Sequence, residues 1–294
     1  MKGIISGIKR MEIHDGDGLR TTVFFKGCPL KCVWCHNPES IGYKKELAYF
    51  DNKCIGCASC YNVCENGAVN MQGYRIDRQR CINCFKCAEI CPTEALVPYG
   101  REYDADELVS ELMTDAAFFK NGRGGITLSG GECLSQGEFA VYVARLLNEK
   151  GISVYVDTCG YVKREVLDRI IPYTDRFLFD IKAISEDRHI KATGKSNSLI
   201  LDNLKYLDSL GCNIEIRIPF VPEYNGDEIG RMAELISTLK SVKKVKVLKY
   251  HNYAGSRYLA LGMKNTLPDT VPNEEERLNA VKAIKCRCPN TTVE

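Results

Sequence analysis

Two matching runs of four cysteines constrain this chain more than any other feature of its sequence. Both have the spacing C-x2-C-x2-C-x3-C, and the second begins 27 residues after the first: Cys54, Cys57, Cys60 and Cys64, then Cys81, Cys84, Cys87 and Cys91. Closely spaced thiolates are soft ligands that suit zinc or an iron–sulfur cluster. The internal repeat predicts a small metal-binding unit over residues 51–98, between the segments 1–50 and 99–294.

The cysteines are expected to be metal ligands rather than disulfides. The chain has 16 cysteines, and 11 of them lie between Cys28 and Cys91. The first residues contain no apolar run long enough for a secretory signal, and no uncharged apolar stretch approaches the ~20 residues that span a bilayer. We therefore expect a cytoplasmic protein, in which thiols stay reduced. Forty basic and 38 acidic residues give a net charge of +2, which indicates neither nucleic acid nor membrane as a partner.

The spacing of the two runs is typical of bacterial ferredoxins, in which the fourth cysteine of each run binds the other cluster. It predicts two 4Fe–4S clusters, one held by Cys54, Cys57, Cys60 and Cys91 and the other by Cys64, Cys81, Cys84 and Cys87. A pair of zinc-binding knots is the alternative. Eight cysteines in two matching runs favour the ferredoxin arrangement.

A third group of cysteines follows the apolar run Thr22–Phe25. Cys28, Cys32 and Cys35 have the spacing C-x3-C-x2-C, and no fourth cysteine occurs within the next 18 residues. Closed structural sites use four protein ligands, whereas three ligands leave one position free for chemistry. Because the eight downstream cysteines pair off among themselves, we expect one open iron here, as the reaction centre.

Alternating helix and strand patterns predict an α/β fold with a parallel sheet. We expect strands at 21–25, 125–129, 153–157, 177–181, 213–219 and 244–249, and helices at 104–119, 136–149, 163–170, 198–210, 227–240 and 274–285. Asp104 is a suitable N-cap for the first helix. About six strands are fewer than the eight of a closed barrel, so the sheet is open or a partial barrel.

Polar or metal-binding residues follow the predicted strands, and in parallel α/β folds such positions meet at one rim. They are the three cysteines, Gly130-Gly131-Glu132, Asp157-Thr158, Asp180-Ile181-Lys182, Arg217 and His251. Each has an ordinary alternative: a helix cap at Asp157-Thr158, a solvated charge at Lys182, an ion-pair partner at Arg217, a structural histidine at His251. Asp15, in the turn His14–Gly18, would by itself be a turn residue. Together on one rim they favour a binding site.

The chemistry of these residues suits an amino-acid group bound at the open iron. Glycines 130 and 131 permit close approach of a ligand to the backbone. Glu132 is expected to accept a hydrogen bond from an ammonium group. Asp157, Asp180 and Lys182 are suited to a carboxylate, hydroxyl groups or a cation.

These motifs resemble those of a known family. Cys28-x3-Cys32-x2-Cys35, with Trp34 before the last cysteine, is similar to the radical S-adenosylmethionine signature. Matches over nearly the whole chain resemble glycyl-radical-enzyme activating enzymes such as pyruvate formate-lyase activating enzyme: His14-Asp15-Gly16-x-Gly18-x-Arg20, Cys35-His36-Asn37-Pro38-Glu39-Ser40, Ser129-Gly130-Gly131-Glu132, Asp180-Ile181-Lys182 and Tyr250-His251. The two-cluster unit resembles the larger branch, which activates choline lyase, glycerol dehydratase and hydroxyproline dehydratase.

The resemblance implies a partial (β/α)6 barrel with three 4Fe–4S clusters in all. A reductant such as flavodoxin or ferredoxin delivers one electron, S-adenosylmethionine is cleaved to methionine and a 5′-deoxyadenosyl radical, and this radical takes a hydrogen atom from a glycine of a partner glycyl radical enzyme. Such proteins are expected to be monomers. The rivals are a radical enzyme acting on another substrate and an iron–sulfur electron-transfer protein.

The resemblance also implies roles for individual residues. Those of the S-adenosylmethionine site are Trp34, Cys35, His36, Gly131, Asp180, Lys182 and His251. Asp157, Thr158 and Asp180 would hold a monovalent cation, Arg217 would lie near the methionine end, and Asp15 would contact the substrate peptide.

Two departures from the family pattern stand out. Asp17 replaces the usual proline, which predicts a more flexible turn or altered partner contacts, and Cys133 replaces a small residue or proline. Cys133, Cys159, Cys212, Cys286 and Cys288 are expected to be spectators.

Overall fold

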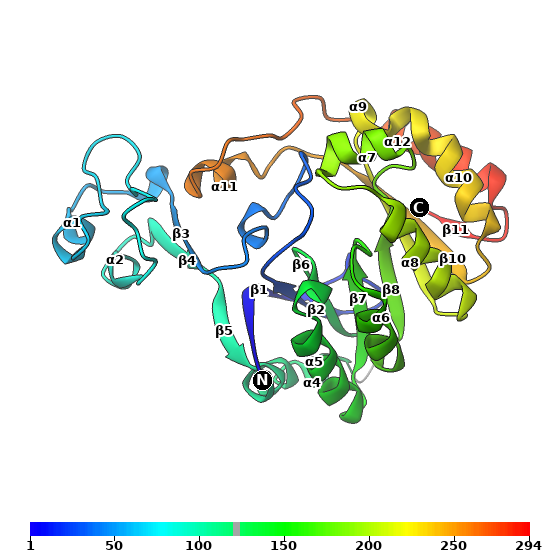
Figure 1. The fold of residues 1–294 in the computed structure, drawn as a ribbon, viewed down its shortest axis with the longest axis horizontal. Helices are drawn as coiled ribbons and strands as arrows, with labels where there is room; N and C mark the ends of the chain where they lie inside the picture. Colours follow the sequence, from blue (N-terminus) through cyan, green and yellow to red (C-terminus); the bar gives the residue numbers. More distant parts are fainter. Residues whose placement is uncertain (120–123) are drawn as a thin grey trace.

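The fold is built around a nine-stranded sheet, seen in a computed structural model that describes residues 1–119 and 124–294 (Figure 1). The strand order is β11-β10-β9-β8-β7-β6-β2-β1-β5. The strands from β2 to β11 in this order are parallel: β2 (Arg20–Phe25), β6 (Gly125–Gly130), β7 (Ser153–Thr158), β8 (Arg176–Asp180), β9 (Ile214–Phe220), β10 (Val242–Lys249) and β11 (Thr292–Val293). β1 (Lys2–Glu12) pairs antiparallel with β2 and β5 (Arg101–Asp104). The sheet stays open, because β5 and β11 are its edges.

Side chains alternate between the two faces of the parallel strands, because successive strand residues point to opposite sides. In β9, Ile214, Ile216 and Ile218 join the main hydrophobic core. Glu215 and Arg217 therefore lie on the other face. Neighbouring strands continue the pattern in register, so that one face of the sheet is apolar. The opposite face, which carries Glu215 and Arg217 and is called the inner face below, is more polar.

Helices cover the apolar face and confirm the expected α/β architecture. They are α5 (Gly137–Glu149), α6 (Arg164–Ile170), α8 (Ser198–Ser209), α10 (Ile229–Thr238) and α12 (Glu274–Arg287). Three short helices at strand ends were not expected: α7 (Glu186–Thr193), α9 (Pro222–Asn225) and α11 (Gly255–Ala260). Over the described ranges, we find no helix with the length and apolar character needed to cross a membrane.

The first predicted helix is in fact two helices. α3 (Ala105–Met113) starts at Asp104, whose side chain accepts a hydrogen bond from a backbone amide of the first turn, as an N-cap does. α4 (Ala116–Phe119) follows after a break at Asp115. The carboxylate of Asp115 accepts a hydrogen bond from the Thr21 hydroxyl at 2.8 Å, so this residue is held by the sheet and interrupts the helix.

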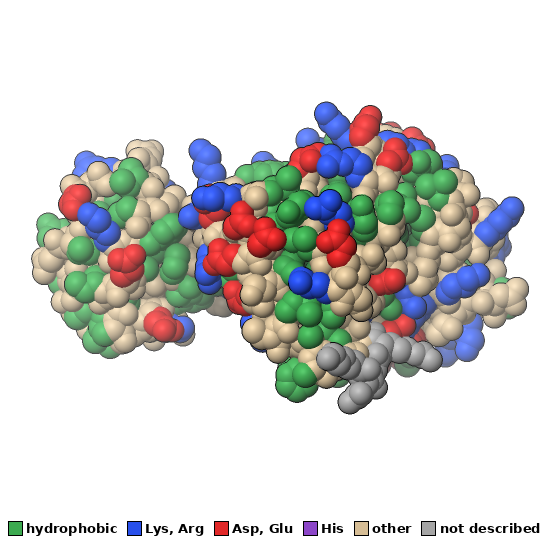
Figure 2. Space-filling view, turned by 90° about the horizontal axis from the view of Figure 1, so that it is seen from below, with side chains coloured by type: hydrophobic (Ala, Val, Ile, Leu, Met, Phe, Trp, Pro, Cys, Tyr) green, Lys and Arg blue, Asp and Glu red, His purple; other side chains and the backbone are tan. Residues whose placement is uncertain are grey.

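The segment between β3 (Glu46–Tyr49) and β4 (Leu96–Tyr99) forms a lobe at the side of the main body (Figure 1). The two strands pair antiparallel at its base. The lobe contains the short helices α1 (Ser59–Val63) and α2 (Lys86–Glu89). Hydrophobic side chains reach its surface in the view of Figure 2.

The repeat in this lobe extends to its backbone conformation. Left-handed φ angles occur in pairs 27 residues apart: Gly56 and Asn83, Ala58 and Phe85, Gly67 and Glu94. For residues other than glycine this conformation costs about 1–2 kcal/mol. It persists at four such positions, so the path of the cysteine loops, and not the local residue type, determines the conformation.

Substitution by glycine should therefore change the free energy of unfolding in opposite directions at two exposed glutamates of the lobe. Glu94→Gly should raise the free energy of unfolding by about 1 kcal/mol, because it relieves the left-handed strain. Glu89→Gly, within α2, should instead lower it by about 1 kcal/mol, because glycine disfavours a helix. Thermal unfolding by calorimetry measures both, and equal effects in the two variants would contradict this reading of the loop.

Candidate active site

A cavity of about 540 Å³ lies at the carboxyl ends of the parallel strands. The parallel strands β2, β6, β7, β8, β9 and β10 each contribute at least one residue to its wall. Most residues predicted from the sequence line it: Asp15, Cys28, Cys32, Trp34, Cys35, His36, Gly130, Gly131, Asp157, Thr158, Asp180, Lys182, Arg217 and His251. Two predicted residues, Glu132 and Ile181, do not.

One loop brings Cys28, Cys32 and Cys35 to the cavity. The Tyr258 hydroxyl donates to the carbonyl of Cys35 at 3.0 Å, and the Cys28 amide donates to the carbonyl of Ile41 at 3.0 Å. Burial raises the pKa of all three thiols, that of Cys35 to about 12. Metal binding must therefore displace their protons. Three sulfur ligands from one loop, facing a cavity with room for a second molecule, fit a cluster with one open iron.

Gly130 and Gly131 are required by the protein's own backbone. Gly130 has a φ of +119°, and a Cβ there would lie 2.2 Å from the Phe25 nitrogen. A Cβ on Gly131 would lie 2.3 Å from the Ser40 carbonyl oxygen and 2.6 Å from that of Gly27. Close packing of the turn after β6 against the cysteine loop thus requires these glycines, in addition to the ligand approach predicted from the sequence.

Glu132 is buried and does not line the cavity, so its role as the acceptor of a ligand's ammonium group stays a prediction. Its carboxylate accepts hydrogen bonds from the Thr158 hydroxyl at 2.9 Å and from the amides of Cys159 at 2.8 Å and Leu134 at 3.1 Å. Burial raises its pKa, although these bonds oppose the shift. Glu132 therefore ties the turn after β6 to the end of β7. Ile181 is a buried core residue.

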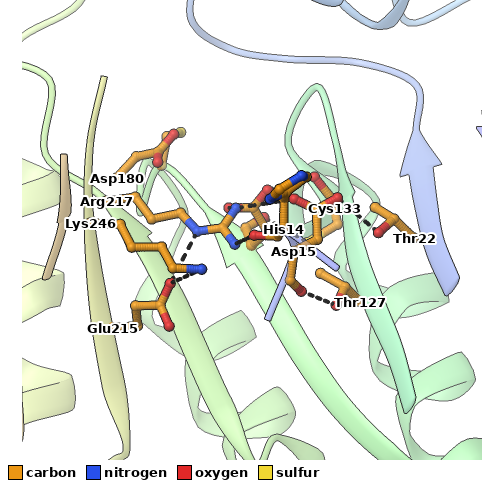
Figure 3. Close-up of polar contacts among 12 residues, drawn as sticks. His14, Asp15, Thr22, Thr127, Cys133, Asp180, Glu215, Arg217 and Lys246 are labelled. Carbon is orange, nitrogen blue, oxygen red and sulfur yellow. Dashed lines mark hydrogen bonds and ion pairs between the residues drawn. The ribbon is translucent and has the colours of Figure 1, made fainter. Parts of the chain in front are cut away.

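Arg217 lies among the charged groups of the cavity (Figure 3). Its guanidinium donates to the carbonyl of His14 at 2.9 Å and to the carboxylate of Asp15 at 3.3 Å, and it lies 3.8 Å from the carboxylate of Asp157. Burial opposes its charge, but the surrounding carboxylates raise the pKa of Arg217 above its ordinary value. Asp15 also accepts a hydrogen bond from Thr22 at 2.9 Å, so it is a turn residue and a cavity residue at once.

Asp157 is a largely buried carboxylate with a raised pKa. Burial and the neighbouring carboxylates of Asp180 and Asp15 raise its pKa to about 7, although Arg217 and a 2.6 Å hydrogen bond from Ser129 oppose this. Asp180 in turn pairs with Lys182 at 2.7 Å. The cavity can therefore present both a cation and carboxylates to a zwitterionic ligand.

A stack of aromatic rings forms another part of the wall. The rings of His36 and His251, which both line the cavity, are nearly parallel with centroids 4.0 Å apart. The exposed ring of Tyr253 stacks on His251 at 4.6 Å. The Nε2 of His36 donates to the carbonyl of His251 at 2.6 Å. Burial and the neighbouring His251 ring lower the pKa of His36 to about 4, so the ring is neutral. Flat neutral rings suit a nucleobase.

Three charged residues behind the cavity were not identified from the sequence: Glu215, Arg176 and Lys246. Glu215 of β9 is buried and lies 3.5–3.7 Å from the cationic groups of Arg176, Arg217 and Lys246. The alternation Ile-Glu-Ile-Arg-Ile in β9 contains the necessary signal, because it puts Glu215 on the same face as Arg217.

The eight cysteines of the lobe surround two small cavities, four around each. One is lined by Cys54, Cys57, Cys60 and Cys91, the other by Cys64, Cys81, Cys84 and Cys87. This is the grouping that ferredoxin spacing predicts.

The remaining cysteines are scattered. Cys133 and Cys288 are buried, and their thiols face backbone carbonyls. Cys286 is exposed, so the Cys286-x-Cys288 pair points in two directions. Cys159 does reach the cavity wall, close to the three-cysteine loop.

The comparisons with known proteins agree with this site. The family model "Radical SAM superfamily" matches residues 22–236. A trans-4-hydroxy-L-proline dehydratase activating enzyme of Clostridioides difficile is 44% identical, over 97% of this chain and 96% of its own length. A choline trimethylamine-lyase activating enzyme of Oleidesulfovibrio alaskensis is 35% identical, over 96% and 94%.

Among solved structures, QueE from Escherichia coli shares the fold, with a TM-score of 0.50 and 13% identity over 100% of this chain and 93% of QueE. With this architecture and these relatives, the chain belongs to the radical SAM superfamily, among the activating enzymes of glycyl radical enzymes.

Proposed function

We propose that this chain cleaves S-adenosylmethionine reductively and removes a hydrogen atom from a glycine of a partner glycyl radical enzyme. The observation that carries the proposal is the shared cavity: the cysteine loop, the charged group around Arg217 and the His36–His251 stack all line it. These three surfaces suit an iron–sulfur cluster, an amino-acid group and a nucleobase. When bound, a 4Fe–4S cluster supplies the electron for cleavage, while the protein orients the reactants and excludes water.

The residues of the cavity divide between the two ends of S-adenosylmethionine. Lys182 and Arg217 are positioned to attract its carboxylate, and Asp180 to accept from its ammonium group or hydroxyls. His36, His251 and Trp34 flank the adenine. Gly130 and Gly131 line the cavity, and the lack of a Cβ lets the turn they form pack against the backbone next to the cysteine loop.

A monovalent cation beside Asp157, Thr158 and Asp180 is part of the proposal. The carboxylates of Asp157 and Asp180 repel each other, which helps to raise the pKa of Asp157. A bound cation would relieve that repulsion, since carboxylate and hydroxyl oxygens are ligands that hard cations prefer.

The lobe is proposed to hold two further 4Fe–4S clusters, with Cys54, Cys57, Cys60 and Cys91 around one and Cys64, Cys81, Cys84 and Cys87 around the other. The repeated backbone conformation and the grouping of the cysteines in fours support this. A flavodoxin or ferredoxin would supply electrons. We further propose that the protein acts in the cytoplasm as a monomer.

The partner is proposed to be a glycyl radical enzyme, and a hydroxyproline dehydratase is the first to test. This choice rests on the 44% identity to an enzyme that activates one. A radical enzyme with another substrate and an iron–sulfur electron-transfer protein are the rival functions. The turn around Asp15 lines the cavity, which supports the proposal that a partner's glycine is presented beside it.

Cys32→Ala should abolish formation of 5′-deoxyadenosine and lower the iron content from about 12 to about 8 per chain, because one of three 4Fe–4S clusters is lost. Cys159→Ala is the matched control, since this cysteine also lines the cavity. It should keep the full iron content and the activity. Full activity in Cys32→Ala would remove this cluster from the mechanism.

Potassium binding should strengthen as the pH rises through about 7, because the proton on Asp157 competes with the cation. The stability of the cation-free protein follows the opposite trend. Because folding raises the pKa of Asp157, the protonated acid stabilises the folded state in acid, and this contribution is lost as the pH rises through about 7. Below that pH the apparent affinity for potassium should fall about tenfold per unit.

The affinity for potassium can be followed by the rise in melting temperature that potassium chloride causes relative to the same concentration of choline chloride. The measurement is made at pH values on either side of the pKa of Asp157. Asp157→Asn should remove the pH dependence, whereas Asp168→Asn, an exposed control, should keep it. A pH-independent shift in the unaltered protein would contradict the cation site.

A glycine-centred radical should appear in the partner when the reduced protein and S-adenosylmethionine are added to a hydroxyproline dehydratase, as measured by electron paramagnetic resonance. Formation of 5′-deoxyadenosine without a radical in any glycyl radical enzyme tested would favour the rival radical enzyme. No 5′-deoxyadenosine at all would favour the electron-transfer protein.

A further inference from the structure

A buried carboxylate lies beneath the cavity, at the centre of a group of cations. Glu215 is 0% exposed, and neither of its carboxylate oxygens has a hydrogen-bond partner among the described residues. Arg176, Arg217 and Lys246 approach it to 3.5, 3.6 and 3.7 Å from β8, β9 and β10. Figure 3 shows two of these contacts. A carboxylate buried this completely is stable only when such charges compensate it.

Both arginines extend from Glu215 to the turn between β1 and β2. Arg176 pairs with Asp17 at 2.7 Å, and Arg217 binds the carbonyl of His14 at 2.9 Å. Lys244 lies a further 4.0 Å from Asp17. The turn is thus attached to β8, β9 and β10 through ionic contacts that meet at Glu215.

The apolar side chain of Ile13, next to this turn, is 64% exposed and so contributes little to holding it. Gly16, with a φ of +127°, lies so close to Tyr155 that a Cβ would be 2.5 Å from that ring. The turn therefore lies against Tyr155, and two kinds of contact hold it there: the ion pairs described above, and hydrogen bonds from the Thr22 and Thr127 hydroxyls to Asp15 at 2.9 and 2.7 Å.

The upper side of the same turn forms the floor of the cavity. His14 and Asp15 line the cavity beside Arg217, while Asp17 faces the ion pairs below. We propose that Asp17 and Glu215 are positioning residues: through Arg176 and Arg217 they hold the turn as a fixed floor against which the substrate glycine is placed. The effect on reaction rests on the proposed function, whereas the position of the turn does not.

Hydrogen–deuterium exchange of residues 13–19, measured without S-adenosylmethionine or partner, tests the position of the turn. Asp17→Asn and Glu215→Gln should each make these amides exchange about tenfold faster, because a charge-assisted contact is lost. Asp17→Glu keeps the charge and should exchange like the unaltered protein. Glu138→Gln, which breaks the ion pair between Glu138 and Arg169 on the helical surface, is the matched control and should change nothing here.

The second measurement is the number of 5′-deoxyadenosine molecules formed per glycyl radical in the partner. Asp17→Asn should raise this ratio about tenfold, because a loosened floor lets cleavage occur without a correctly placed glycine. Simple loss of folded protein would lower both products together and leave the ratio unchanged.

Unchanged exchange in Asp17→Asn would overturn the proposal, as would an unchanged ratio. If Glu215→Gln does not fold, Asp17→Asn decides alone, because its ion pair is only partly buried. If the unaltered protein forms no 5′-deoxyadenosine, the proposed function fails, and the exchange measurement still tests the floor.

Discussion

Pairing of buried charges on the inner face of the sheet is the constraint on which the rest of this structure depends. A charge removed from water is stable only with compensating partners. Here they come from several strands and from a turn that lies 159 residues from Arg176 and 202 from Arg217 in the sequence. Arg217 is the link between the two levels of this network. Above it are Asp15 and Asp157 of the cavity, and below it is Glu215. The same pairing that stabilises the inner face therefore sets the electrostatics of the site.

The cavity wall is equally a product of tight backbone contacts. Gly130 and Gly131 bring the end of β6 against the cysteine loop and the Ser40 carbonyl. Glu132, directly after them, accepts hydrogen bonds from Thr158 and Cys159 at the end of β7. The Gly130-Gly131-Glu132 motif, which from the sequence suggests ligand binding, thus also packs the end of β6 against the cysteine loop.

The lobe shows how a duplicated sequence can carry a conformation that its residues do not favour. Ala58 and Phe85 are both left-handed, although neither residue type prefers this region. Their common feature is the position within a cysteine run. The eight thiols, grouped in fours across the two runs, account for a backbone path that local preference does not explain.

Sequence patterns alone predicted the class of fold and most residues of the cavity. Strand periodicity, cysteine spacing and the rule that parallel strands end at one rim are local or topological, so they can be recognised without coordinates. The same local signals found the N-cap at Asp104 but missed the break at Asp115, because that break depends on a hydrogen bond to the sheet.

Only the tertiary structure decided the direction of Glu132, the engagement of Asp15 by Arg217, and the place of Glu215 and Asp17 beneath the cavity. Each of these depends on which side chains meet across distant strands, and residue type does not reveal this. Asp17 illustrates the difference. From the sequence, Asp17 was a missing proline that predicted a more flexible turn or altered partner contacts, whereas its ion pair with Arg176 ties the turn to the sheet.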